Sequence, residues 1–164
     1  MIEAFFIWLE NTLLSEWVRG EFDGSTMVFP IVISLHAIGM GFMAGIASMI
    51  NLRVLGVARA VPLARLGAFL PVAWLALAIN VVSGLLLLIG YPTKALTNPV
   101  FYLKLACIGG GLWILFWIRR HLLRVDAEPS AQARLLAGVG TCLWIAAIVT
   151  GRLLAYTHTK LMSS

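Results

Sequence analysis

The sequence predicts an all-α integral membrane protein, a four-transmembrane-helix bundle preceded by an amphipathic interfacial helix. The first observation is composition. Of the 164 residues, 61% are hydrophobic and 12% are charged, and a soluble domain of this length cannot bury so much apolar surface. The second is the gathering of this apolar sequence in four nearly uncharged stretches, each about as long as the ~20 residues that cross a bilayer. The stretches are residues 27–50, 66–90, 99–118 and 135–156.

The continuity of these stretches predicts helices rather than strands. Strands of a membrane barrel show short segments of alternating hydrophobicity, whereas a helix satisfies its backbone hydrogen bonds within one uninterrupted run. Residues 27–156 are therefore predicted to form one helical domain, and residues 157–164 a C-terminal tail.

Residues 1–20 are predicted to form an amphipathic helix ahead of the first span. Apolar residues recur there at helical spacing among three glutamates, as in a helix that lies along a membrane interface. Packing on the protein's own helices or on a partner subunit is the alternative. Because the segment lacks a basic start, it does not resemble a secretory signal, and we expect the first span to act as its own insertion signal. The apolar residues are Ile2, Phe5, Phe6, Leu9, Leu13 and Trp17.

Two spans begin with recognisable capping signals. Asn98 precedes Pro99, which is the order expected for an N-cap and the first helical residue. Before the first span, Ser25 or Thr26 is the predicted cap, with Pro30 in the first turn.

The basic residues predict the orientation, because short loops rich in Lys and Arg stay on the cytoplasmic side. The two loops on one side carry seven basic residues, against three on the other. Both loops are therefore predicted to be cytoplasmic and both termini periplasmic, in a bacterial inner membrane. The seven are Arg53, Arg59, Arg65, Arg119, Arg120, Arg124 and Arg134, and the three are Arg19, Lys94 and Lys160.

Several function classes find no support in the composition. The net charge of +5 comes largely from these topology signals, so nucleic-acid binding is not expected. Cys107 and Cys142 both fall inside spans, which argues against a disulfide framework. The spans contain no nucleophile–base pair and no paired carboxylates, so we do not expect the chain to be an enzyme on its own.

Ionisable residues inside the predicted spans are costly and are commonly functional. With a helical rise of ~1.5 Å per residue, His36 lies about 13 Å and Lys104 about 9 Å from the periplasmic face. Arg152 lies roughly 6 Å from that face at the end of the fourth span. Asn80 and Ser83 fall in the same half, at depths of about 15 and 10 Å. These groups predict one polar pocket that faces the periplasm.

Each of these residues also has a structural interpretation. The long side chains of Lys104 and Arg152 can extend to the lipid head groups, although Tyr156 shares a face with Arg152 at helical spacing. His36 is too short and too deep for this, so its alternative is a neutral imidazole hydrogen-bonded between helices. The predicted cofactor-binding set is His36, Lys104, Arg152, Asn80, Ser83 and Tyr156.

Two kinds of organic ligand fit such a pocket. A haem b would take His36 as an axial ligand, with Lys104 and Arg152 on its propionates. Its second axial ligand is unassigned, because His158 lies beyond Arg152 on a different helical face and His121 lies at the cytoplasmic end. A quinone head group or another anion would instead be held by the same three basic residues.

A soft metal is a further alternative. His36, Met40 and Met43 recur at i, i+4 and i+7 on one helix, and imidazole and thioether groups suit Cu(I). A ligand from another helix would be needed, such as Cys107. The structural interpretation is a packing seam in which methionines fill gaps, beside glycines that let another helix approach. These glycines are Gly39, Gly41 and Gly45, with Gly84 and Gly111 on neighbouring spans.

Four segments, read together, resemble a group of small bacterial inner-membrane proteins classed as a domain of unknown function. The segments are "SLHAIGMGFMAG", "NLRVLG", "NPVFYLK" and "TGRLLAY". This resemblance covers most of the chain from the first span onward and implies functional positions at His36, Asn51, Lys104 and Arg152. Asn51 stands where an Asp is expected in that group. The chain is also loosely similar to the four-helix units of copper-resistance membrane proteins and b-type cytochromes, whose larger number of histidines argues against bis-histidine haem ligation here.

The predicted function is a redox-associated membrane subunit with a periplasm-facing pocket around His36 that binds haem b or a quinone. One alternative is a non-catalytic anchor or accessory subunit for a periplasmic partner, docked through residues 1–20. Another is Cu(I) handling through His36, Met40 and Met43. The expected partners are the lipid bilayer and a periplasmic or membrane redox partner, and the sequence leaves oligomerisation open.

Overall fold

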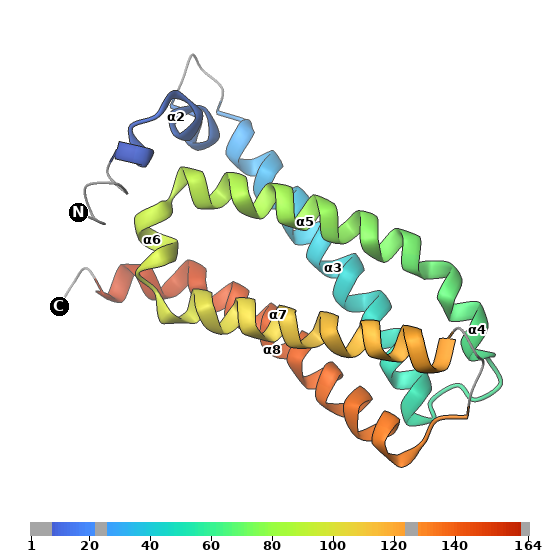
Figure 1. Cartoon of the computed structure of the whole chain (residues 1–164). Coiled ribbons are helices and arrows are strands. Elements are labelled where there is room, and N and C mark those ends of the chain that lie inside the picture. Colours follow the sequence, from blue (N-terminus) through green and yellow to red (C-terminus); the bar gives the residue numbers. More distant parts are fainter. Residues whose placement is uncertain (1–7, 22–25, 124–127, 162–164) are drawn as a thin grey trace.

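The computed structural model describes residues 8–21, 26–123 and 128–161 (Figure 1). All regular structure in these ranges is helical, which confirms the predicted all-α class. The elements are α2 (Leu13–Arg19), α3 (Val28–Leu55), α4 (Leu63–Leu66), η1 (Gly67–Phe69), α5 (Leu70–Gly90), α6 (Pro92–Leu96), α7 (Pro99–Ile118), η2 (Arg119–Leu123) and α8 (Ala131–Leu161).

Four helical segments are long and apolar enough to cross a membrane, as predicted: Val28–Leu55, Leu63–Gly90, Pro99–Leu123 and Ala131–Leu154. Several run further than the apolar stretches indicated, into turns that carry arginines. Such an extension is physically reasonable because an arginine in a terminal turn can place its guanidinium in water while its stem stays on apolar surface. The helix α8 itself continues to Leu161, so most of the predicted tail is helical.

The long helices are packed side by side, with α3 between two neighbours. α3 packs against α5 and α8, and α7 packs against α8, whereas the backbones of α5 and α7 make few close approaches. The short helix α6 connects α5 to α7, near α2 and the C-terminal part of α8 (Figure 1). We call this the α6 end of the molecule. α4 and η2 contact each other at the opposite end, which we call the α4 end.

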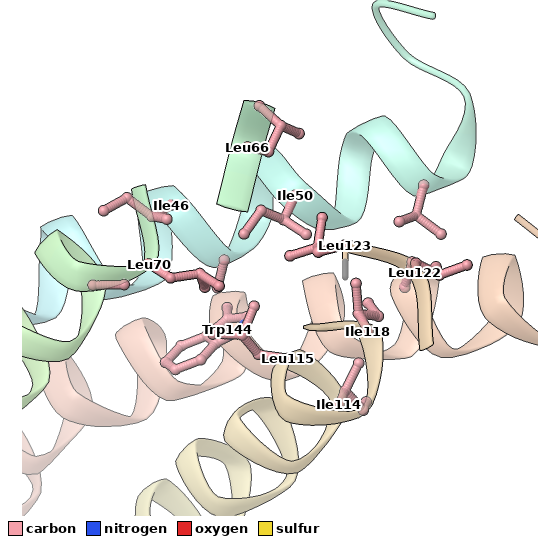
Figure 2. Close-up of a cluster of buried hydrophobic side chains, with 14 of the residues drawn as sticks. Ile46, Ile50, Leu66, Leu70, Ile114, Leu115, Ile118, Leu122, Leu123 and Trp144 are labelled. Atoms are coloured by element: carbon pink, nitrogen blue, oxygen red, sulfur yellow. The ribbon is translucent and has the colours of Figure 1, made fainter. Parts of the chain in front are cut away.

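A cluster of buried apolar side chains joins α3, α5, α7 and α8 toward the α4 end (Figure 2). Trp144 is 1% exposed and lies so close to Gly111 that a Cβ there would come within 2.9 Å of the indole ring. Such contacts between a large and a small residue hold helices together in lipid, where the hydrophobic effect does not. Labelled members of the cluster are Ile46, Ile50, Leu66, Leu70, Ile114, Leu115, Ile118, Leu122, Leu123 and Trp144.

The prediction of one continuous N-terminal helix is wrong for the part that the structure describes. A turn at Asn11–Thr12 interrupts it. The Thr12 hydroxyl donates to the Leu9 carbonyl at 2.8 Å, and its oxygen accepts from the Ser15 amide at 3.4 Å. Thr12 is therefore the N-cap of α2, because a threonine side chain at this position replaces the helical backbone bond. Residues 1–7 lie outside the described residues.

The helix α2 packs on the protein's own helices, as one of the two interpretations predicted. Val18 is fully buried and lies against Gly90, where a Cβ would come within 3.0 Å of a Val18 methyl. Leu13 and Trp17 stay exposed on the opposite face, and Leu14 is exposed beside them. This apolar exposed face is typical of a segment at a membrane interface.

Capping of the spans was predicted correctly for α7 and incorrectly for α3. The Asn98 Oδ1 accepts from the Val100 amide at 3.0 Å, and Pro99 is the first residue of α7. Met27 occupies the N-cap position of α3 without a side-chain hydrogen bond. Thr26 precedes that position, and Ser25 lies outside the described residues.

Candidate functional site at the His36–Lys104 pair

The candidate site is centred on the imidazole of His36, which is half-buried in the α6-end part of α3. Its Nδ1 atom faces α5, at 3.1 Å from the Asn80 carbonyl oxygen and 3.1 Å from the Ser83 Oγ. Its Nε2 atom faces α7, at 3.1 Å from the Lys104 Nζ. One side chain thus connects three helices at the depth where the sequence predicted a polar pocket.

Asn80 and Ser83 hold the imidazole from α5. The Asn80 side-chain amide donates to the His36 backbone carbonyl at 2.8 Å, so α3 and α5 are joined in both directions. The Ser83 hydroxyl donates to the Ile79 carbonyl at 2.6 Å, which leaves its oxygen to accept from His36. Both side chains are buried, and this satisfies polar groups that would otherwise be costly in an apolar environment.

These contacts determine where the protons lie. A carbonyl oxygen can only accept, so Nδ1 of His36 carries the hydrogen that faces Asn80. Nε2 then presents its lone pair to Lys104, whose ammonium group donates. A second hydrogen on Nε2 would place an imidazolium against an ammonium, which like-charge repulsion disfavours. With Lys104 protonated, the pair holds one positive charge between two nitrogen atoms.

Three glycines allow the helices to come close enough for this arrangement. A Cβ on Gly84 would lie 3.0 Å from the His36 Cε1, and one on Gly39 would lie 2.8 Å from the Ala76 carbonyl oxygen. Gly151 of α8 faces the stem of Lys104, with 3.5 Å between a Cβ built there and the lysine Cε. The small residues predicted to give room at Gly39 and Gly84 therefore lie directly against the site.

No carboxylate among the residues that the structure describes forms an ion pair with Lys104. Lys104 is half-buried, and the ion pair formed between described residues is Arg19–Glu21, outside the spans. Cations inside an apolar protein region are normally paired or bound to a ligand. The site thus has an unpaired positive charge next to a proton-accepting nitrogen.

Arg152 and Tyr156 lie close to each other rather than in this cluster. The Arg152 guanidinium lies 5.8 Å from the centroid of the Tyr156 ring, as their helical spacing predicted. Both side chains are exposed. Since Gly151 faces Lys104 and successive residues of a helix are rotated by ~100°, Arg152 begins on a different face of α8. These two residues could reach a ligand only at the rim of the site.

The methionines predicted as metal ligands lie in or against the buried apolar cluster that Trp144 belongs to. Met43 is 1% exposed within the apolar cluster, and Met40 packs against that cluster. No group of three His, Cys, Asp or Glu side chains suited to a metal occurs in residues 8–21, 26–123 and 128–161. The Cu(I) arrangement stays a prediction, and the His158 side chain lies outside the described residues.

Sequence reasoning missed the direct contact between His36 and Lys104. The signal was present, since their predicted depths on the first and third spans differ by only about 4 Å. It also missed two buried polar atoms in the packed region, the Asn51 Oδ1 and the Trp144 Nε1, for which no partner lies among the described residues. The resemblance had singled out Asn51, but nothing in the sequence distinguishes Trp144 from the other tryptophans.

No family model, no curated protein and no solved structure matches this chain. The resemblance to small inner-membrane proteins of unknown function, like the looser one to copper-resistance proteins and b-type cytochromes, stays a prediction.

Proposed function

We propose that this chain is a redox-associated membrane subunit that binds a quinone head group at the His36–Lys104 pair. The observation that supports the proposal is the 3.1 Å contact between Lys104 Nζ and His36 Nε2, with the opposite ring nitrogen held by α5. An ammonium has three N–H donors and one of them meets His36, so others are available to a ligand oxygen. The pair thus offers both a donor and a proton acceptor.

A quinone matches this combination in both of its redox states. Its carbonyl oxygen can accept from the Lys104 ammonium, and the hydroxyl formed on reduction can donate to Nε2 of His36. Reduction takes up two electrons and two protons. In this proposal the electrons come from a redox partner subunit and the protons from the aqueous side at the α6 end.

The proposal includes the membrane arrangement that the sequence predicts. The four long helices form a transmembrane bundle in a bacterial inner membrane, with the α6 end on the periplasmic side. This orientation follows from the arginines of the α4 end, which belong to the cytoplasmic side. The quinone would then be bound in the periplasmic leaflet.

Haem b is the second candidate, and a specific observation favours it. A backbone carbonyl that accepts from one imidazole nitrogen orients many metal-ligating histidines, and Nε2 of His36 would be the ligating atom. Iron at Nε2 would take the position of the Lys104 Nζ, whose ammonium would then be free to pair with a propionate. The quinone is preferred because its two redox states use both nitrogen atoms of the pair, and its reduced form replaces only the hydrogen bond from Lys104 to His36 Nε2.

A visible absorption spectrum of the full chain, purified in mild detergent, separates the two candidates. A Soret band that sharpens on reduction and disappears in H36A would favour haem and contradict the quinone. A colourless protein would next be titrated with a short-chain benzoquinone, with quenching of tryptophan fluorescence as the measurement. We expect K104M to weaken binding about tenfold or more, as for loss of a hydrogen bond to a charged group.

The matched control is K94M, because Lys94 lies on α6 outside the cluster. Equal affinities of K104M and K94M for the benzoquinone would contradict the proposed site.

A further inference from the structure

A cavity of about 280 Å³ lies at the α4 end, far from the His36–Lys104 pair. Its walls come from η1 and the first turns of α5 on one side and from η2 on the other. Arg119 is the one charged residue among otherwise uncharged lining residues. The lining residues are Gly67, Leu70, Pro71, Trp74, Arg119 and Leu123.

Both backbone segments that form this cavity depart from regular α-helix. Gly67–Phe69 is a short 3₁₀-helix before Pro71, and Arg119–Leu123 forms a π-helical turn after α7. A π-helical turn inside a longer helix is rare and occurs frequently at functional sites. Here it widens the helix at the residue that brings the charge to the cavity.

Arg119 differs in its surroundings from Arg53 and Arg59 at the same end. Arg53 donates to the backbone carbonyls of Val61 and Arg59, at 2.5 and 3.0 Å. The Nε of Arg59 likewise donates to the Gly56 carbonyl. No hydrogen bond or carboxylate partner of the Arg119 side chain occurs among the residues that the structure describes. A half-buried guanidinium in this state can bind an anion with all its donors.

We propose that this cavity binds the phosphate group of an anionic phospholipid. A guanidinium binds a phosphate through two parallel hydrogen bonds. Basic pockets between membrane helices on the cytoplasmic side bind phospholipid head groups, and Trp74 is of the residue type that gathers at that interface. The apolar walls suit the glycerol and the first acyl carbons rather than a fully hydrated anion.

The cavity is lined by the N-terminal turns of α5 and by η2, which continues α7. The site is at the opposite end from the His36–Lys104 pair, so it does not depend on quinone binding there, although it rests on the proposed orientation in the membrane.

The test is lipid binding to the full chain in detergent, measured by native mass spectrometry with phosphatidylglycerol and phosphatidylcholine. The wild-type protein should retain phosphatidylglycerol preferentially. In R119Q the preference for phosphatidylglycerol over phosphatidylcholine should fall about fivefold, the effect expected of one basic residue near the membrane surface. R120Q is the matched control, since Arg120 is exposed and does not line the cavity. Equal loss in R119Q and R120Q would overturn the proposal.

A second variant separates binding in the cavity from general attraction by a basic surface. Gly67 lines the cavity, and a Cβ there meets nothing within 4 Å, so G67L places a side chain in the space without changing any charge. It should reduce phosphatidylglycerol retention as R119Q does, and unchanged retention in both variants would overturn the proposal. Inorganic phosphate at millimolar concentration should not displace the lipid. Displacement would assign the site to a soluble anion and overturn the lipid assignment.

Discussion

The two ends of the molecule are held together by different interactions. Toward the α4 end, large side chains such as Trp144 and Leu115 are 1% exposed and pack against other apolar groups. Toward the α6 end, the same helices are joined by hydrogen bonds that converge on His36. The packing around Trp144 depends on shape and offers no hydrogen bond to exchange, whereas the hydrogen bond between Lys104 and His36 can be exchanged for one to a ligand. The comparison locates the exchangeable interactions at the α6 end.

The largest expected effect tests the packed region. W144A should lower the free energy of unfolding by about 3–5 kcal/mol, the usual cost of removing a buried aromatic side chain. Reversible unfolding in mixed detergent micelles is the measurement. W113A is the control, because Trp113 is 59% exposed. If the two variants lose equal stability, the α4 end does not depend on packing around Trp144.

The next effect tests the polar region. H36A removes hydrogen bonds to α5 and leaves the Lys104 ammonium without its acceptor, so we expect a loss of about 1–3 kcal/mol. Hydrogen bonds between membrane helices contribute toward the lower part of this range. S34A is the control, since Ser34 lies on the same helix and is exposed. A loss in H36A no larger than in S34A would show that the hydrogen bonds do not stabilise the α6 end.

A smaller change should alter the site with less effect on the packing. In G84A the added methyl would lie 3.0 Å from the His36 Cε1, so the ring must shift away from α5. We expect a loss of stability on the order of 1 kcal/mol and severalfold weaker binding of the benzoquinone. In G41A the methyl meets nothing within 4 Å and should leave both properties unchanged. Equal benzoquinone affinity in these two variants would contradict the role of His36 orientation.

The membrane-length helices and the polar residues of one half could be predicted from the sequence, because apolar length and intramembrane ionisable groups are strong constraints. The faces through which these helices contact one another could not be predicted from the sequence. α3 is apolar all round: it exposes Ile38 and Phe42 and buries Met43, and no polar stripe marks the difference. The contact of His36 with the Asn80 backbone carbonyl was unpredictable for another reason. Every helical residue has such a carbonyl, and only the register set by Gly39 and Gly84 selects this one.

The smallest expected effect concerns Arg19 at the α6 end, whose side chain binds residues within and beside α2. Its Nη1 donates to the Glu10 carbonyl at 2.8 Å and to the Ser15 Oγ at 2.6 Å. Its Nη2 also forms an ion pair with Glu21 at 2.9 Å. The hydrogen bond from Arg19 lowers the pKa of the Glu21 carboxyl, and the same bond raises the pKa of Arg19.

A carboxyl with a lowered pKa in the folded state stabilises the fold at pH values above its unfolded pKa. That contribution is lost as the pH falls through the folded pKa. Because Glu21 is exposed, we expect only a slight change in stability, so its titration by NMR is the better measurement. R19Q should return the midpoint of Glu21 toward the ordinary glutamate value, whereas R65Q, at the α4 end, should not. An unchanged midpoint in R19Q would mean that Arg19 holds α2 through the Glu10 carbonyl and Ser15 alone. The contacts of Arg19 would then resemble those of the His36–Lys104 pair, which are hydrogen bonds rather than ion pairs.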